Sequence, residues 1–219
     1  LISKVRVRMA PTLGLIQLDD RKHHRNSINA VVMGSLFPRA DSEMEASEQT
    51  RIRKALPDSL AFRQQLPLSS SFLSTVCDRV VVMADIDERG RGAYAWSPMQ
   101  LDKGKAGSQL STWFALPWGR TEQIVLPGYH TPAESALKRG GAGNEIFLSV
   151  LGMMSTGTRT VAMSRWRTGG QANHDLIREL VLELPHTSPS EALQRSIHLV
   201  MAFSFAQFDS GTPYRGIPT

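Results

Sequence analysis

The chain has 219 residues, of which 41% are hydrophobic and 21% are charged, and its formal net charge is +5 at pH 7. This balance is typical of a globular protein and excludes an intrinsically disordered or collagen-like chain. Lysine and arginine are mixed with aspartate and glutamate throughout, without a long basic stripe that also carries aromatic residues. Nucleic-acid binding is therefore disfavoured despite the positive charge.

Cysteine content and hydropathy restrict the compartment and the kinds of site. Cys77 is the single cysteine, which excludes an internal disulfide and a cysteine-rich zinc site and fits a reducing compartment. No run approaches the roughly 20 apolar residues that span a bilayer, and basic residues interrupt the apolar ones near the N-terminus. We expect a soluble cytoplasmic protein that has no membrane segment, no cofactor and no bound metal.

Five apolar segments rich in β-branched residues are predicted to be strands. Each is bounded by glycine, proline or charged residues, and they span residues 29–37, 79–86, 123–126, 146–150 and 159–164. Several lack alternation, which is typical of central strands covered on both faces. With helical segments between them, they indicate an α/β fold with a mostly parallel central sheet and helices on both faces.

Two helices are predicted towards the C-terminus from apolar spacing and capping residues. In residues 171–184 the apolar side chains recur at intervals of one and three to four, and Pro185 ends the pattern. Ser188, Pro189 and Glu191 then provide an N-cap, a first-turn proline and a capping-box partner for the next helix. Shorter helices are predicted at residues 43–56, 108–116 and 132–138.

The two ends of the chain are predicted to be less regular than its middle. Residues 1–37 contain alternating segments that fit an N-terminal hairpin or edge strands, and residues 206–219 are rich in turn formers, which favours an irregular tail. Because no convincing linker is visible, we predict a single domain over residues 1–219.

Two predicted strand ends carry the residues considered for chemistry. His130 follows the strand at 123–126 after a Pro-Gly turn, and Leu151 ends the strand at 146–150. If these strands are neighbours in a parallel sheet, both ends lie at its carboxyl edge, about 5 to 10 Å apart. A nucleophile and its general base need that proximity.

At these residues the sequence resembles the bacterial CHAT domain, a caspase-like cysteine peptidase family. The segments "LPGYHTPAE" and "FLSVLGMMSTGTRTVAMSRWRTGGQ" carry the resemblance, which is best supported over residues 79–201. It implies a caspase-like fold, a protein substrate, His130 as the general base and Leu151 at the position where the family has its nucleophilic cysteine. It also implies that the backbone at Gly152 contributes to an oxyanion site.

Asp85 and Asp87 lie at the end of the predicted strand at 79–86, where the resemblance implies that the specificity pocket lies. Two carboxylates there would favour a basic side chain in the substrate. Helix capping or a surface salt bridge is the plainer interpretation of both residues.

The leucine at position 151 decides what the resemblance can mean. Leucine has no ionisable proton and cannot form a thioester, so covalent catalysis at this position is impossible. Cys77 is expected to be a buried structural thiol rather than a replacement. The resemblance thus implies a CHAT-type endopeptidase domain without its nucleophile: either a natural pseudopeptidase that binds or regulates proteins, which we favour, or a peptidase altered at this residue.

An alternative is a plain protein-interaction module with an α/β sheet and no peptidase ancestry. The two hypotheses differ in geometry. A peptidase ancestor requires the side chains of His130 and Leu151 to converge, whereas a plain interaction module has no reason to bring them together.

Overall fold

The structure, a computed structural model, describes residues 29–33, 50, 54, 59–63, 71–83, 110–116, 118, 121–126, 144–164 and 171–209. The chain forms two compact units. The sheet unit comprises Ala10–Leu36 and Asp58–Thr168, and the helical unit comprises Leu1–Met9, Phe37–Pro57 and Gly169–Thr219. That the two units belong to one domain stays a prediction.

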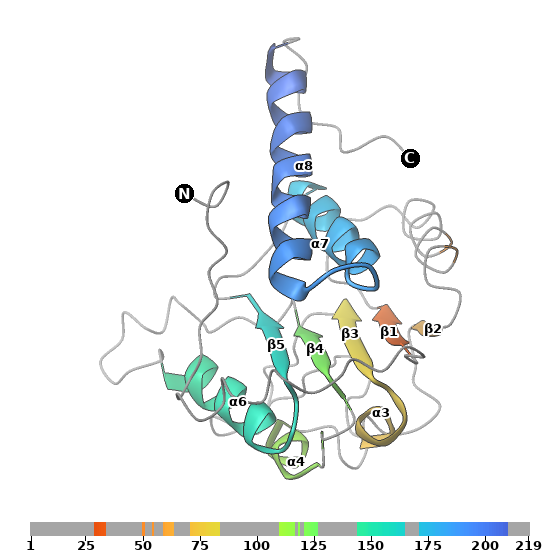
Figure 1. Ribbon diagram of the computed structural model, residues 1–219, viewed down its shortest axis with the longest axis vertical. Coiled ribbons are helices and arrows are strands. Elements are labelled where there is room, and N and C mark those ends of the chain that lie inside the picture. The colour runs from red at the N-terminus through yellow and green to blue at the C-terminus, as the bar shows by residue number, and fades with distance from the viewer. Residues whose placement is uncertain are drawn as a thin grey trace. The chain divides into compact units, whose positions relative to one another are not determined.

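The sheet unit contains a five-stranded sheet in the order β2-β1-β3-β4-β5 (Figure 1). All four pairs of neighbouring strands are parallel. This arrangement confirms the predicted α/β class and the mainly parallel sheet; coverage of both faces by helices stays a prediction. The strands are β1 (Asn29–Met33), β2 (Ser59–Arg63), β3 (Arg79–Met83), β4 (Gln123–Leu126) and β5 (Thr160–Met163).

The burial of the strands follows their position in the sheet. In the central strands, Val81 of β3 and Ile124 of β4 have no exposed surface, as expected for apolar runs without alternation. Leu60 in the edge strand β2 is 40% exposed. The sequence did not predict β2, because the pentapeptide SLAFR is short and has polar residues at both ends.

Backbone hydrogen bonds extend the pairing just beyond the amino ends of the three strands β3, β4 and β5. The amide of Glu122 donates to the carbonyl of Asp78 at 2.7 Å, and the amide of Thr160 donates to the carbonyl of Glu122 at 2.9 Å. The strand register aligns Arg79, Gln123 and Thr160 in one row across the sheet. The amino edge of the sheet is therefore closely held together.

Three helices of the sheet unit each precede a strand (Figure 1). They are α3 (Ser71–Val76), α4 (Leu110–Ala115) and α6 (Asn144–Ser155). At the end of α4, Trp113 and Trp118 are both fully buried with ring centroids 5.1 Å apart, and the Trp118 indole donates to the Trp113 carbonyl at 2.6 Å. This aromatic pair is a large part of the described core.

The segment predicted as a strand at residues 146–150 is part of helix α6, so that prediction was wrong. Apolar residues occur here at 146, 147, 148, 150, 151, 153 and 154, a set that includes the three- and four-residue intervals of a helix. The five residues 146–150 taken alone also fit a strand, and only the apolar residues that continue beyond Gly152 favour the helix. The glycine at 152 lies inside the helix and does not terminate it.

Gly157 ends helix α6. Its φ of 123° lies in the region that side chains disfavour. The amide of Gly157 donates to the carbonyl of Met154 at 3.1 Å, and the amide of Thr158 donates to the carbonyl of Met153 at 3.3 Å. These two bonds form a Schellman motif, which turns the chain out of the helix and into β5.

The helical unit contains α7 (Gln171–Glu183) and α8 (Pro189–Asp209), which pack against one another. Both predicted helices are confirmed, including the start of α8 at the proline. Helix α8 continues to Asp209, so residues 206–209 are helical rather than irregular. Thr50 and Lys54, the described part of the helix predicted at 43–56, are also helical, whereas the helix predicted at 132–138 lies outside the described residues.

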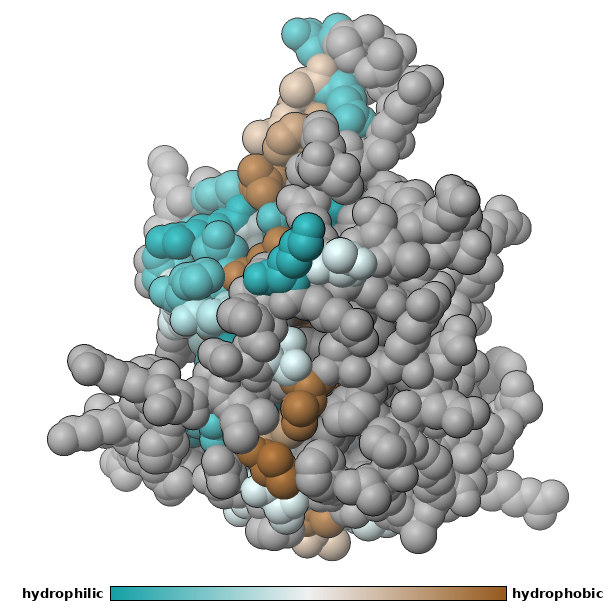
Figure 2. All heavy atoms as spheres, turned by 90° about the vertical axis from the view of Figure 1, so that its right-hand side faces the viewer, coloured by the Kyte–Doolittle hydropathy of each residue, from teal (hydrophilic) through white to brown (hydrophobic). Residues whose placement is uncertain are grey.

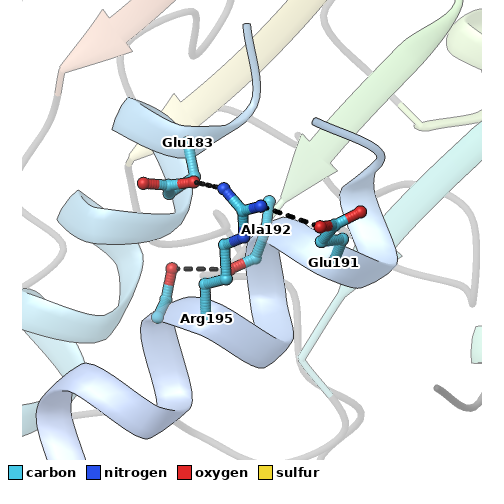
Figure 3. Close-up of polar contacts among 5 residues, drawn as sticks. Glu183, Glu191, Ala192 and Arg195 are labelled. Carbon is cyan, nitrogen blue, oxygen red and sulfur yellow. Dashed lines mark hydrogen bonds and ion pairs between the residues drawn. The ribbon is translucent and has the colours of Figure 1, made fainter. Parts of the chain in front are cut away.

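Arg195 joins the end of α7 to the start of α8 (Figure 3). Its guanidinium contacts the carboxylate of Glu183 at 3.1 Å and that of Glu191 at 2.9 Å. The hydrogen bond that the Arg195 guanidinium donates to the Glu183 carboxylate is the main cause that raises the pKa of Arg195 above its ordinary value. Beside it, the Ser196 hydroxyl donates to the carbonyl of Ala192 at 2.8 Å, which satisfies this buried polar group within the helix.

Candidate functional site

The described residues place only part of the predicted catalytic site. Leu151 lies inside helix α6 and its side chain is half-buried. Gly152 is the next residue of the same helix. The positions of His130, Asp85 and Asp87 lie outside the described residues. Their predicted roles therefore stay predictions.

Leu151 does not lie at the carboxyl end of a strand. It is one helical turn from the end of α6, and residues 156–159 connect that end to the amino end of β5. By contrast, β4 ends at Leu126 on the carboxyl edge, and from there the chain leads to His130. The strand-end reasoning that set Leu151 beside His130 was wrong, because it required residues 146–150 to be a strand.

Gly152 has a packing role that a sequence alone cannot reveal. A Cβ atom at this position would lie 2.9 Å from Cδ1 of Phe114 in α4, so the glycine allows the two helices to approach closely. Its carbonyl accepts hydrogen bonds from the hydroxyls of Ser155 at 3.0 Å and Thr156 at 3.1 Å. A backbone amide inside a helix donates to the carbonyl four residues earlier, so this setting does not favour an oxyanion role.

Cys77 is a buried thiol, as the sequence predicted. It has no exposed surface and lies between α3 and β3. Its carbonyl accepts a hydrogen bond from the hydroxyl of Thr121 at 2.7 Å, which links the segments before β3 and β4. A nucleophilic cysteine needs access to its substrate and a thiolate, and full burial opposes both.

Charged residues gather at the amino edge of the sheet, where they join the strands. The Arg79 guanidinium donates to the side-chain oxygen of Gln123 at 2.6 Å. Burial lowers the pKa of Arg79 from its ordinary value to about 10, although the nearby carboxylates of Glu122 and Asp78 oppose this shift. The group therefore remains a cation at neutral pH, and its contacts are those of a structural residue.

Next to this group, Arg159 is paired less well. Its guanidinium lies 3.7 Å from the carboxylate of Glu122, and the Arg159 side chain is only 7% exposed. Among the described residues, its two terminal nitrogens have no hydrogen-bond partner, and neither has the hydroxyl of the fully buried Thr158. Such donors need water or another polar group when they are buried.

A second buried charged cluster lies on helix α7. The Arg178 guanidinium is 3.1 Å from the carboxylate of Asp175 and 2.8 Å from that of Glu179. Asp175 has no exposed surface and Arg178 is 1% exposed. Because the charges are paired with one another along one helix, we interpret the cluster as structural.

The strand order itself identifies one place where a ligand could bind. The order reverses between β1 and β3, whose last residues Met33 and Met83 are partners in the register. In open parallel sheets, ligands bind at the carboxyl edge beside such a reversal. Asp85 and Asp87 follow Met83 by two and four residues. This edge is a candidate ligand site, defined by its two strand ends.

Two further kinds of site were sought in the described part of the chain. No group of three or more His, Cys, Asp or Glu residues there could hold a metal ion. Among the same residues, no helix combines the length and the apolar character needed to cross a bilayer.

Helix α8 carries a row of exposed apolar side chains that the sequence analysis did not single out. Leu193 is 41% exposed, Met201 49% and Phe205 65%, and Ile197 between them is half-buried. These residues recur every four positions and so form a continuous ridge along one face of the helix. Figure 2 shows apolar side chains at the surface in the upper part of the view, where α8 runs. We call Leu193, Ile197, Met201 and Phe205 the α8 ridge.

The α8 ridge is separate from the face of the helix that packs inward. Ala192, Ser196 and Val200 are the buried residues of that face, and they also recur every four positions. The apolar spacing of this helix predicts a single face that includes Leu193, Ile197, Val200 and Met201. Counting two apolar rows instead of one would have found the ridge.

No family model, curated protein or solved structure matches the chain. The functional assignment therefore depends on the geometry of these described residues.

Proposed function

We propose that the chain is a non-enzymatic α/β module that acts by binding another protein. The observation that carries this proposal is the α8 ridge, in which Phe205 is 65% exposed. Large aromatic side chains contribute much of the binding energy at protein interfaces, and contiguous exposed apolar patches mark interaction sites.

Two features argue against cysteine-peptidase chemistry in this chain. The position assigned to the nucleophile is a leucine inside helix α6, and the single thiol of Cys77 is fully buried. Neither residue can present a thiolate to a peptide bond. The resemblance to CHAT domains is retained here as a proposed ancestry: a pseudopeptidase scaffold that binds proteins without cutting them.

The parallel sheet is compatible with that ancestry but does not select it. Doubly wound α/β proteins of many functions share a parallel sheet with a reversal of strand order. The resemblance of the segments around His130 and Leu151 is what supports a caspase-like origin.

A thiol-labelling experiment tests the absence of catalysis. We expect Cys77 to resist a peptide-based thiol probe in the native protein and to react fully after denaturation, because only unfolding exposes the sulfur. The native protein should also leave a mixture of fluorogenic peptides uncleaved. Hydrolysis that His130→Ala abolishes would contradict the proposal.

The ancestry has its own test, the variant Leu151→Cys. A converging histidine would lower the pKa of the new thiol and make it react with the peptide probe or cut the chain itself. Rapid labelling that His130→Ala removes would support a peptidase ancestor. Labelling at the rate of an ordinary thiol would support the plain interaction module.

Binding can be tested by placing a photoreactive amino acid at Met201 and, as a matched control, at the exposed neighbour Ala202. The two positions are consecutive on α8 but lie on different faces of the helix. We expect the photoreactive group at position 201 to form a covalent adduct with the bound protein, and the same group at position 202 to form none. Equal adducts from both positions, or none from either, would contradict binding through the ridge.

A further inference from the structure

We infer that the α8 ridge pairs with the α8 ridge of a second copy of this chain. The inference rests on the proposed function, since it names the protein that the ridge binds. Three features of helix α8 carry it. They are the spacing of the ridge residues, the lack of Asp, Glu, Lys and Arg in residues 196–208, and the number of exposed side chains in the ridge.

The spacing suits packing of one helix against another. Residues four apart form ridges that fit into the grooves of a second helix, and two such ridges pack together at a crossing angle of about 50°. The α8 ridge is about 18 Å long from Leu193 to Phe205. A twofold axis through its midpoint would set Ile197 against Met201 of the partner subunit. Such an interface is self-complementary.

The charge distribution permits contact between identical surfaces. Residues 196–208 include no Asp, Glu, Lys or Arg. A partner with a charged surface would find no complement along this segment, and a second copy meets no like-charge repulsion there. The nearest described charged residue before this segment, Arg195, already contacts Glu183 and Glu191.

The same feature disfavours a membrane surface as the occupant. Helices that lie on anionic membranes carry lysine and arginine on the face opposite the apolar one. Between Arg195 and Asp209, helix α8 has no such residue. A protein surface of the same apolar character is the better match.

The extent of the ridge indicates the strength of the contact. Interfaces below about 1,200 Å² in total belong to the weak, transient class. One ridge from each of two helices falls in that class, because only four side chains contribute on each side. We therefore expect a reversible dimer that forms as concentration rises into the micromolar range.

Sedimentation velocity over a hundredfold range of concentration tests this inference. The wild-type chain should shift from the monomer mass towards twice that mass. Phe205→Glu should remain monomeric over the whole range, because the exposed ring at the end of the ridge is replaced by a charge. The control Ala202→Glu adds the same charge at an exposed position off the ridge and should dimerise like the wild type.

Cross-linking identifies the surface within the dimer. Met201→Cys lies close to the proposed twofold axis and should form an intermolecular disulfide on mild oxidation, and Ala202→Cys should not. The native Cys77 does not interfere because it is fully buried. Circular dichroism of each variant checks that α8 is intact.

Several outcomes would overturn the inference. A wild-type chain that is monomeric at every concentration would do so, as would a dimer that Phe205→Glu leaves unchanged. Binding of the monomer to lipid vesicles that Phe205→Glu abolishes would assign the ridge to a membrane instead. The proposed function fails separately, through peptide hydrolysis or through the absence of ridge-dependent adducts in the photo-cross-linking experiment.

Discussion

The central sheet and the C-terminal half of helix α8 differ in how they expose large apolar side chains. In the sheet unit, Val81 and Trp113 have no exposed surface. Val81 in β3 also pairs with Val31 of β1 on one side and with Val125 of β4 on the other. On α8, Met201 and Phe205 are about half or more exposed. One region uses its apolar residues for folding, and the other keeps them accessible.

The buried apolar side chains of the sheet unit contribute to the stability of the fold, whereas the exposed ones on α8 contribute little to it. Exposing an aromatic ring costs solubility without adding to the fold, and contiguous exposed apolar patches mark interaction sites. The buried polar groups of the sheet, by contrast, have their hydrogen-bond partners within the fold. Arg79 and Gln123 satisfy one another inside the sheet and are not offered to a ligand.

Replacing one aromatic residue in each region gives the sharpest test of the comparison. Trp113→Ala removes a fully buried indole and should lower the free energy of unfolding by about 3 to 5 kcal/mol. Phe205→Ala, measured where the chain is monomeric, should change it by less than about 0.5 kcal/mol. Urea unfolding followed by circular dichroism measures both. Similar losses in the two variants would show that the ridge belongs to the core.

A smaller effect is expected from the buried pair at the amino edge of the sheet. Arg79→Met leaves the amide of Gln123 buried without its partner and should cost about 1 to 3 kcal/mol. The double variant Arg79→Met/Gln123→Leu should recover part of that loss, because it removes both polar groups. A double variant that is less stable than the sum of the two single changes would contradict this account.

The same pair makes a prediction about pH. Burial lowers the pKa of Arg79 to about 10 in the folded chain, below its ordinary value in the unfolded chain. Between these two values the unfolded chain binds more protons at this group, so its contribution to stability rises with pH. The wild type should therefore gain stability relative to Arg79→Met as pH increases above 10.

Gly152→Ala tests the close approach of α6 and α4. Alanine favours a helix over glycine by about 1 kcal/mol, but its Cβ would lie 2.9 Å from the Phe114 ring. Overpacking of this kind costs about 1 to 3 kcal/mol, so we expect a net loss of roughly 1 to 2 kcal/mol. In a Phe114→Leu background the loss should shrink or reverse. An equal loss in both backgrounds would exclude the ring as its cause.

The smallest expected change is at the end of α6. Gly157→Ala forces a Cβ into a backbone conformation with φ of 123° and should cost about 1 kcal/mol. Gly157→Asn should cost less, because asparagine tolerates this region better. Thermal unfolding measures the order of the three proteins. An alanine variant as stable as the wild type would mean that the Schellman turn can relax at no cost.

Local signals predicted much of the secondary structure and failed at one identifiable place. Pro185 and Pro189 marked the end of α7 and the start of α8, because proline acts directly on the backbone. The strands β3 and β4 were also predicted, from runs that only a buried parallel sheet accommodates. Residues 146–150 were misassigned because a short apolar run before a glycine fits either a strand end or a helix interior.

The candidate site was less predictable because it depends on which segments become neighbours. The sequence suggested that Leu151 and His130 share an edge of the sheet, and helix α6 removes the strand on which that suggestion depended. Likewise, the α8 ridge is left exposed because Ala192, Ser196 and Val200 occupy the buried face of the same helix.

By itself, the amino-acid sequence determined the α/β class, the long C-terminal helices, the burial of Cys77 and the lack of a thiol at position 151. Each of these follows from the chemistry of residues close together in the chain: apolar spacing, capping groups and the identity of one side chain. Only the tertiary structure decided the strand order, the contact of Gly152 with Phe114 and which apolar row of α8 is left exposed. Those features depend on contacts between segments far apart in the chain, and many different pairings satisfy the same local pattern.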